Sequence, residues 1–334
     1  MKLSHKERVN RILEGKNVDR PAISMWRHFY DRENTRKDIV NVMIEFQRKY
    51  DWDFMKINTR ASYHIEDWGA KFVFSDNPQI KPQRMEFPIR NRHDWEKIKW
   101  LDPRNGALGE ILGAVSDLVA EIGDEVYCLP TIFSPLSIAA DLAENDLRFV
   151  EILHDEPAEL KMALEAIAST FGGFVRELLK AGAAGIFFAT TEWASRDLLT
   201  EEEYLEFGQP YDLEVLKSAQ SGLFDVMHIC NNNNMLPLFK NYPAHVLSWN
   251  PYDEGNLSIH QAAQIFDMTF LAGVDHLQAM AKGSPGNVKK QIEDSLRDAP
   301  TGKLMIGPGC ALKVVTPEEN IKAALETVQG WKYE

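Results

Sequence analysis

The sequence has few cysteines and no long apolar run. Its 334 residues include three cysteines, Cys128, Cys230 and Cys310. They are too few and too scattered for a disulfide framework, and an odd number leaves at least one thiol unpaired. No apolar run approaches the roughly 18 residues needed to span a bilayer, and the charged N-terminus, MKLSHKERVNRILEG, lacks the apolar core of a signal peptide. The sequence therefore predicts a cytoplasmic protein whose thiols are free or bind a metal.

The chain also has fewer basic than acidic residues. Lysine and arginine number 37 against 50 acidic residues, which gives a net charge of -13 at pH 7. Nucleic acids and anionic membranes are bound by basic patches, so this balance argues against both as partners. With 44% hydrophobic and 26% charged residues, the chain is typical of a globular protein with a large core. A small molecule or a protein is the expected partner, and no pattern indicates an oligomeric state.

Eight short apolar runs alternate with segments of helical periodicity. The runs are residues 20–26, 53–58, 125–133, 184–190, 223–229, 245–250, 268–274 and 303–309. The helical segment 155–182 contains Pro157 in an acidic first turn, and Thr200 and Glu203 have capping-box spacing at the start of the next helix. Eight strands with eight crossovers predict a (β/α)8 TIM barrel with an N-terminal helical extension. We find no linker, low-complexity tract or repeat, so residues 1–334 are predicted to form one domain.

The most informative residues for chemistry lie at the ends of the predicted strands, where barrel enzymes carry their sites. His228 and Cys230 end the fifth run, and residues two apart in a strand point to the same side. Cys310 follows the eighth run in the turn GPGC. One imidazole and two thiolates suit zinc, and three protein ligands leave a fourth position for a substrate. The alternative is that both cysteines are small buried residues and His228 is a core histidine.

Four consecutive asparagines, residues 231–234, follow this motif. Each would need hydrogen-bond partners inside a core, whereas asparagine is common in turns and at helix N-caps. We therefore expect the strand to end at about Cys230 and a helix to begin in MLPLF, residues 235–239.

The chain resembles the uroporphyrinogen decarboxylase superfamily, and within it the corrinoid-dependent methyltransferases of the methylcobalamin:coenzyme M type. The resemblance covers nearly the whole chain, in the stretches DRPAISMWRH, LTEEEYLEFGQPYDLEVL, GVDHLQAMAKGSPGNVKKQIEDSLR and GPGCALKVVTPEENIKAALETV. The last stretch is the most specific. The resemblance implies a (β/α)8 barrel, and the zinc motif of these methyltransferases, His-x-Cys with a distant Cys, falls on His228, Cys230 and Cys310.

The decarboxylase branch of this superfamily matches less well. Its arginine-rich RQAGRY stretch corresponds to MWRHFYDR, which keeps Arg27 but has Asp31 where the second arginine falls. Its catalytic aspartate after the second strand corresponds to KINTRAS, which has Asn58 and no acid before Glu66. Its C-terminal histidine motif is replaced by GPGC. The resemblance therefore favours the methyltransferases.

In the methyltransferases, zinc lowers the pKa of an acceptor thiol, and the thiolate attacks the methyl group on the cobalt of a corrinoid. The resemblance thus implies methyl transfer between methylcobalamin or another corrinoid, free or on a corrinoid protein, and a small acceptor such as a thiol, in either direction. Two alternatives remain open. One is a metal-independent decarboxylase of a small carboxylated substrate held by Arg27, and the other is a non-catalytic zinc- or corrinoid-binding protein.

Further candidate site residues follow other strands. Glu192, after the fourth run, is a candidate fourth zinc ligand or base, against the simpler reading of a charge at a helix N-terminus. His64 is a candidate catalytic group, and Asn58, Glu66 and Arg27 are candidates for substrate binding.

Two acids and three aromatic residues complete the set. Asp253 and Asp275 follow the sixth and seventh runs. They are candidates for orienting the ligands of the site without contacting the metal themselves. The aromatic candidates for contact with substrate or a flat corrin are Trp193, Trp249 and Tyr252. Cys128 lies inside the third run among apolar residues and is predicted to be a core residue.

Overall fold

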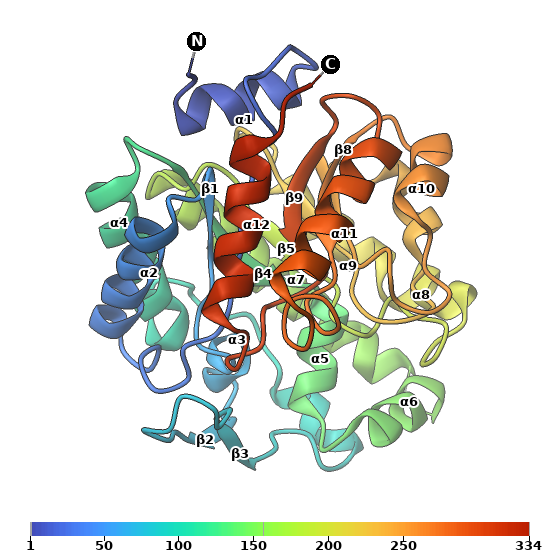
Figure 1. Ribbon diagram of the computed structural model, residues 1–334. Helices are drawn as coiled ribbons and strands as arrows, with labels where there is room; N and C mark the ends of the chain where they lie inside the picture. Colours follow the sequence, from blue (N-terminus) through green and yellow to red (C-terminus); the bar gives the residue numbers. More distant parts are fainter. Residues whose placement is uncertain (1, 156, 334) are drawn as a thin grey trace.

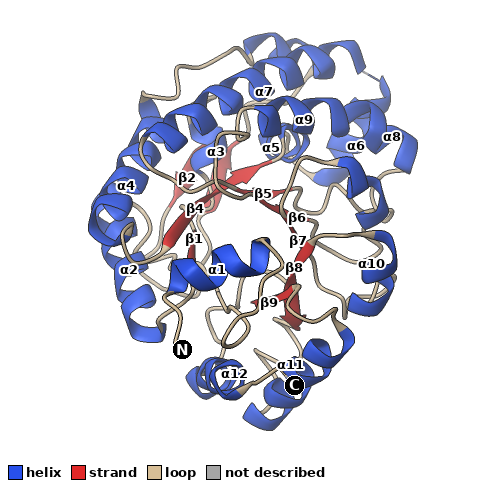
Figure 2. Cartoon of the chain, turned by 90° about the horizontal axis from the view of Figure 1, so that it is seen from above, coloured by secondary structure: helices blue, strands red, loops and turns tan. Residues whose placement is uncertain are grey.

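The computed structural model describes residues 2–155 and 157–333. Its main sheet has seven parallel strands in the order β1-β4-β5-β6-β7-β8-β9. The strands are β1 Phe54–Ile57, β4 Tyr127–Phe133, β5 Phe187–Ala189, β6 Val226–His228, β7 Val246–Ser248, β8 Thr269–Val274 and β9 Leu304–Pro308. Figure 2 shows the strands around a central space, with most of the helices outside them. The prediction of a (β/α)8 TIM barrel is confirmed.

The first predicted strand, residues 20–26, is the exception. In this segment Ile23 forms an isolated parallel bridge with Ile306 of β9 and no regular strand. Its backbone is nevertheless bonded on both sides. The Ser24 N–H donates to the Ile306 carbonyl at 3.0 Å, and the Asp53 N–H donates to the Ile23 carbonyl at 2.9 Å. The segment therefore lies between β9 and β1 and closes the barrel without being a strand itself.

Helices alternate with the strands along the chain. They are α1 His5–Leu13, α2 Arg36–Tyr50, α3 Tyr63–Glu66, α4 Gly106–Ile122, α5 Pro135–Leu142, α6 Asp146–Asp155, α7 Pro157–Lys180, α8 Glu201–Phe207, α9 Gln209–Lys217, α10 Ile259–Ile265, α11 Pro285–Asp298 and α12 Glu318–Gly330, with 3-10 helices η1 Arg92–Lys97 and η2 Leu236–Asn241. Helix α1 is the predicted N-terminal extension and crosses one end of the barrel (Figures 1 and 2). Within the described residues, no helix is long and apolar enough to cross a membrane.

Two helix predictions can be compared with the structure. Helix α7 runs from Pro157 to Lys180, two residues shorter at each end than the predicted segment 155–182. Thr200 is the N-cap of α8 and forms the predicted capping box with Glu203. The predicted long helix after Thr200 is divided, because α8 ends at Phe207 and α9 begins one residue after Gly208. The proline in the first turn of α9 lacks the N–H that a continuous helix would need.

A two-stranded antiparallel hairpin was not predicted. Its strands are β2 Lys71–Val73 and β3 Gln83–Glu86. Figure 1 shows the hairpin at the end of the molecule opposite α1 and the two termini. Val73 and Met85 are more than half exposed, so the hairpin presents apolar surface at the end of the barrel where the parallel strands finish.

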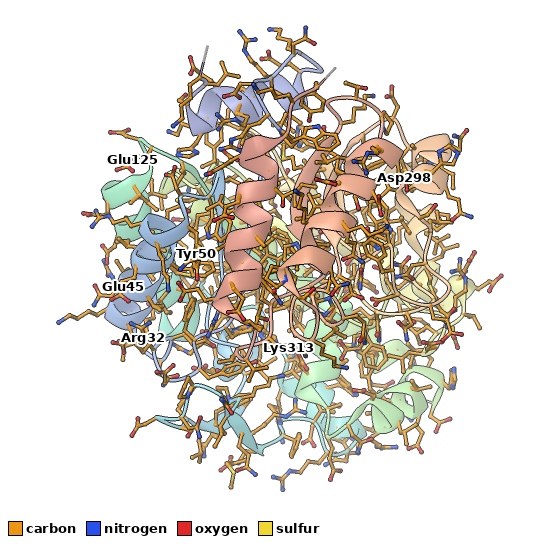
Figure 3. All side chains as sticks on the ribbon, in the orientation of Figure 1. Arg32, Glu45, Tyr50, Glu125, Asp298 and Lys313 are labelled. Atoms are coloured by element: carbon orange, nitrogen blue, oxygen red, sulfur yellow. The ribbon has the colours of Figure 1, made fainter. Side chains whose placement is uncertain are left out.

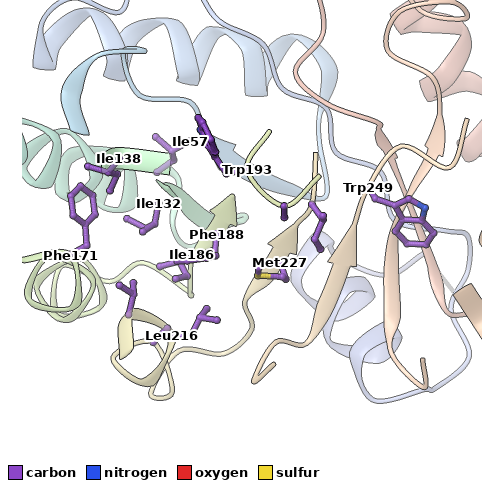
Figure 4. Packing of buried hydrophobic residues seen from close by; sticks show 14 of the residues in the cluster. Ile57, Ile132, Ile138, Phe171, Ile186, Phe188, Trp193, Leu216, Met227 and Trp249 are labelled. Carbon is purple, nitrogen blue, oxygen red and sulfur yellow. The ribbon is translucent and has the colours of Figure 1, made fainter. Parts of the chain in front are cut away.

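The core has two layers because strand side chains alternate between the two faces of the sheet. The cluster outside the strands packs against the helices and includes Ile57, Phe188 and Met227 (Figure 4). A second cluster fills the barrel interior and includes Phe54 and Phe187. Interior positions therefore alternate with helix-facing positions, and the interior ones continue toward the carboxyl ends of the strands.

The outer faces of the helices are charged (Figure 3). Arg32 and Glu45 form an ion pair of 2.7 Å in which both side chains are about half exposed. Such surface pairs contribute little to stability because water screens them. The large core, rather than these pairs, stabilises the barrel.

A buried carboxylate, Asp53, joins the N-terminal segment to the barrel. It is fully buried and accepts hydrogen bonds from Arg8 at 2.5 Å, from Arg20 at 2.7 Å and from the Ile23 N–H at 2.8 Å. Burial alone would raise the pKa of Asp53, but hydrogen bonds from His5 and Arg20 hold it below the ordinary value. The carboxylate is thus ionised and neutralised by arginines inside the fold.

We predict that Asp53→Asn lowers the free energy of unfolding by about 3–5 kcal/mol, because it leaves buried arginine charge without its partner. Urea denaturation followed by circular dichroism measures this change. Asp51→Asn is the matched control, since Asp51 contacts the same His5 but is mostly exposed, and it should leave the free energy nearly unchanged. Equal effects of the two variants would contradict the assigned role of Asp53.

Candidate metal centre

A cavity of about 300 Å³ opens at the carboxyl ends of the strands. Its wall is formed by side chains at the ends of β1, β4, β5 and β6 and by the segments that follow Trp26 and β9. A second hollow, of about 530 Å³, lies elsewhere, near Tyr127 and Cys128. Burial raises the pKa of the Cys128 thiol to about 12. The Cys128 side chain is 2% exposed and belongs to the hydrophobic core, which confirms the prediction.

Three side chains of the predicted metal motif meet in the first cavity. The ligand atoms of His228, Cys230 and Cys310 all lie within 4.8 Å of one another, and the two sulfurs are 3.4 Å apart. His228 is the last residue of β6, and Cys310 comes two residues after the end of β9. In the part of the chain that the structure describes, no other group of three histidine, cysteine or acidic side chains comes this close.

His228 is held in one orientation by the neighbouring strand. Its Nδ1 lies 3.0 Å from the Ser248 hydroxyl, and Ser248 is the register partner of His228 on β7. Its Nε2 is buried and has no hydrogen-bond partner among the described residues. A buried ring nitrogen without a partner is costly unless something binds it. The ring is therefore positioned to use Nε2 as a ligand.

The two thiols are coupled by a hydrogen bond. The Cys230 thiol donates to Cys310, which lowers the pKa of Cys310 well below its ordinary value. The same hydrogen bond, together with burial, raises the pKa of Cys230. One thiolate is thus stabilised by the other thiol, and a bound cation would allow both to ionise. One nitrogen and two sulfurs at these separations fit tetrahedral zinc, whose ligand bonds are about 2.0–2.3 Å long.

The backbone turns sharply beside both cysteines. Asn231 and Asn233 have φ values of 72° and 47°, in the left-handed region that asparagine tolerates. The strand ends at His228, close to the predicted end, and η2 follows where a helix was expected. On the other side, a side chain at Gly309 would come within 2.4 Å of Asn250. Only glycine fits before Cys310 in this turn.

Three of the other predicted residues, Glu192, His64 and Asn58, line the same cavity. Glu192 follows Thr191, whose φ of 47° is rare for a β-branched residue. Burial raises the pKa of Glu192, although its carboxylate is not within the metal group. The Nε2 of His64 lies 2.7 Å from Asp141, and its Nδ1 has no partner among the described residues.

Three more predicted residues do not line this cavity. Trp193 and Trp249 are 1% and 0% exposed. Trp193 packs edge-on against Phe149, at 4.7 Å between ring centroids, and the Trp249 indole donates to a backbone carbonyl. Glu66 accepts hydrogen bonds from Arg60 at 2.7 and 2.9 Å. The structure gives each of these side chains a partner outside the cavity.

The remaining candidates also lie outside the cavity wall. The Arg27 guanidinium is 5.0 Å from the centroid of an aromatic ring, and the Tyr252 hydroxyl lies 2.5 Å from that of Ser295. Asp253 accepts a hydrogen bond of 2.6 Å from the side chain of a neighbouring asparagine. Asp275 accepts a hydrogen bond of 2.6 Å from a backbone N–H in its own loop. Their predicted contacts with substrate stay predictions.

Lys56 lines the cavity from β1, although the sequence did not predict it as a site residue. Its ammonium donates to Asn58 Oδ1 at 2.6 Å and lies 4.7 Å from the centroid of the Phe187 ring. Burial lowers the pKa of Lys56 to about 7, against the negative charges of Cys310 and other groups, which raise it. The available signal was a lysine between Phe54 and Asn58 on the interior face of an apolar strand.

The family of this barrel, with its histidine and cysteine cluster, follows from its similarity to known proteins. A family model described as uroporphyrinogen decarboxylase (URO-D) matches residues 4–331. The chain belongs to this family.

The relatives include both branches of the family. A protein named methylcobamide:CoM methyltransferase MtbA, from Methanosarcina acetivorans, is 24% identical over 76% of this chain and 73% of its own. A uroporphyrinogen decarboxylase from Crocosphaera subtropica is 22% identical over 96% of this chain and 94% of its own. A solved methyltransferase from Methanosarcina mazei has a TM-score of 0.83 at 17% identity over 98% of both chains, which supports the fold.

We predict that the protein binds about one zinc per chain through its three-ligand centre and that His228→Ala, Cys230→Ala and Cys310→Ala each lose most of it. Ser248→Ala should weaken zinc binding by about 10–100-fold, because the ring of His228 is then free to turn. Plasma mass spectrometry and competition with a chelator measure these changes. Cys128→Ala is the control and should keep its metal; full zinc content in all three ligand variants would refute the site.

We also predict that Lys56→Met stabilises the metal-free protein at pH 6 by about 1–3 kcal/mol, since it removes a buried charge. The folded-state pKa of about 7 lies below the ordinary 10.5. Between these values the unfolded chain binds more protons, so wild-type stability rises with pH, and the variant should lack this contribution. Urea titrations from pH 6 to 10 in chelator test this, with the exposed Lys81→Met as control. A variant less stable than wild type at pH 6 would contradict it.

Proposed function

We propose that this protein is a zinc-dependent methyltransferase that moves a methyl group between a methylated corrinoid and a small acceptor, specifically a thiol. The observation that carries the proposal is the meeting of His228, Cys230 and Cys310 within 4.8 Å in a cavity at the carboxyl end of the barrel. Three ligands leave a position for an acceptor, and the donor set suits zinc. Zinc bound there would supply a Lewis acid that lowers the pKa of a thiol.

The chain's own residues divide the remaining work. Ser248 orients the His228 ring through its 3.0 Å contact and thereby fixes which nitrogen faces the cavity. Phe133 and Phe187 form apolar parts of the wall and exclude water from the acceptor. Burial raises the pKa of Glu192, which makes its carboxylate a stronger base for the acceptor's proton.

The names of the relatives support the chemistry and the partners. The protein named methylcobamide:CoM methyltransferase supports a corrinoid donor and a small thiol acceptor. The cavity of about 300 Å³ has room for a small acceptor and little more, so the corrinoid would approach from outside, free or on a corrinoid protein. The exposed apolar side chains of the β2–β3 hairpin lie at this end of the barrel and suit such an approach.

A metal-independent decarboxylase is the second candidate, because relatives with that name match nearly the whole chain. It requires Arg27 to hold a carboxylate, yet Arg27 lies outside the cavity wall. It also leaves the meeting of two cysteines with an unpartnered histidine nitrogen without a role. We therefore favour methyl transfer over decarboxylation and over metal or corrinoid binding without turnover.

We predict that the zinc-loaded protein consumes methylcobalamin when a small thiol is present, and that His228→Ala does not. Glu192→Gln should lower the rate by about 100-fold while zinc content stays unchanged, because it removes the base without removing a ligand. Corrinoid absorbance measures the rate, and mass spectrometry identifies the methylated product. Unchanged kinetics would remove Glu192 from the mechanism. Metal-independent release of carbon dioxide from a small acid would favour the decarboxylase.

A further inference from the structure

The Lys56 side chain is a buried cation to which the described part of the chain offers no ion-pair partner. It is 7% exposed, and its ammonium donates a hydrogen bond to the neutral amide oxygen of Asn58 at 2.6 Å. No carboxylate of the described residues forms an ion pair with it. An ammonium carries three N–H donors, so two remain available. A buried charge in this condition is unfavourable unless an anion comes to it.

Aromatic rings join Lys56 to the metal ligands. Its ammonium lies 4.7 Å from the centroid of Phe187 and 5.6 Å from that of Trp26. The Phe187 ring is in turn 5.3 Å from the ring of His228. Lys56 is thus one side chain away from the metal group, in a part of the cavity where apolar walls keep water out and strengthen charge interactions.

The charged groups near Lys56 do not neutralise its ammonium before a ligand binds. The groups that interact with Lys56 electrostatically are Cys310, Glu33 and Cys230. Glu33 already accepts hydrogen bonds from His28, at 2.9 and 3.2 Å, and from a backbone N–H at 2.9 Å. The thiolates of the two cysteines would balance the two charges of a zinc ion, so that centre is neutral with a neutral imidazole.

An acceptor that arrives as a thiolate adds one negative charge to this neutral group. The two acids of the cavity wall, Glu192 and Asp141, carry no positive charge and cannot compensate that of the thiolate. Lys81 also lines the cavity, but its side chain is exposed and therefore screened. The one buried lysine among the described residues of the wall is Lys56, and its charge compensates that of the acceptor.

We propose that Lys56 is a positioning residue that stabilises the acceptor in the form of an anionic sulfur and so makes the cavity selective for thiols over neutral acceptors. The proposal rests on the proposed methyl-transfer function and deepens it. When the acceptor binds, its S–H bond breaks, the sulfur keeps the electron pair beside the ammonium, and the proton passes to Glu192 and from there to the buffer. Lys56 keeps its protons in this step, because the anionic sulfur beside it favours the charged form of the lysine.

Binding of a thiol without any methyl donor tests this role. The probe is 2-mercaptoethanol, which has no charge apart from its sulfur, and its methyl thioether serves as an analogue that cannot ionise. Calorimetry of the zinc-loaded protein from pH 6 to 10, in two buffers with different ionisation enthalpies, gives the affinity and the number of protons released. The variants are Lys56→Met, Lys56→Gln and Lys56→Arg, with Lys81→Met as control, and the zinc content of each is measured.

We expect both neutral variants to keep their zinc and to bind the thiol at pH 7 about tenfold more weakly or worse. The pH midpoint of thiol binding should rise by about one unit or more, while affinity for the thioether stays within about twofold of wild type. Lys56→Arg should recover most of the thiol affinity because it keeps the charge, and Lys81→Met should resemble wild type.

Other outcomes overturn the proposal in distinguishable ways. Equal thiol affinity and pH dependence in wild type and both neutral variants would remove Lys56 while leaving methyl transfer intact. Equal loss of thiol and thioether binding would mean that Lys56 only shapes the cavity. If the zinc-loaded wild type binds no thiol, this inference fails together with the thiol acceptor, and the corrinoid assay still decides whether methyl groups reach a different acceptor.

Discussion

The ion cluster around Asp53 is the interaction on which the rest of the structure depends. Its carboxylate bonds to Arg20 and to the backbone of Ile23, and so fixes the irregular segment 20–26 between β9 and β1. With the barrel closed there, Trp26, His28 and Tyr30 become part of the cavity wall at the other end. A charge network at the amino end of the barrel therefore determines the shape of the cavity at the carboxyl end.

Because the strands are parallel, their carboxyl ends lie at the same end of the barrel and bring the site residues together. His228 is opposite Ser248 on the next strand, and its ring gains both an orienting partner and a free nitrogen. The cysteines come from chain positions 80 residues apart and meet at 3.4 Å. Within the described residues, one ring nitrogen of His228 and one of His64 have no hydrogen-bond partner here, and no carboxylate forms an ion pair with Lys56. Proteins tolerate such groups at sites where a ligand satisfies them, because elsewhere they lower stability.

Much of the fold was predictable because local patterns carry it. Apolar runs gave seven of the strands, and the capping box at Thr200 gave the start of α8. The segment 20–26 was predicted as a strand because it is equally apolar, but its backbone bonds depend on Asp53 and β9, which are distant in sequence. The β2–β3 hairpin was missed since its exposed residues carry no burial pattern.

The sequence by itself predicted the barrel class and the cluster of three candidate ligands, because strand periodicity places His228 and Cys230 on one side and the resemblance adds Cys310. Only the tertiary structure decided which other residues share the cavity. Trp193 and Trp249 pack in the core and Arg27 lies outside the cavity wall, whereas Lys56 faces the cavity. The physical reason is that burial and charge environment arise from side chains contributed by many strands, and no local pattern of residues specifies them.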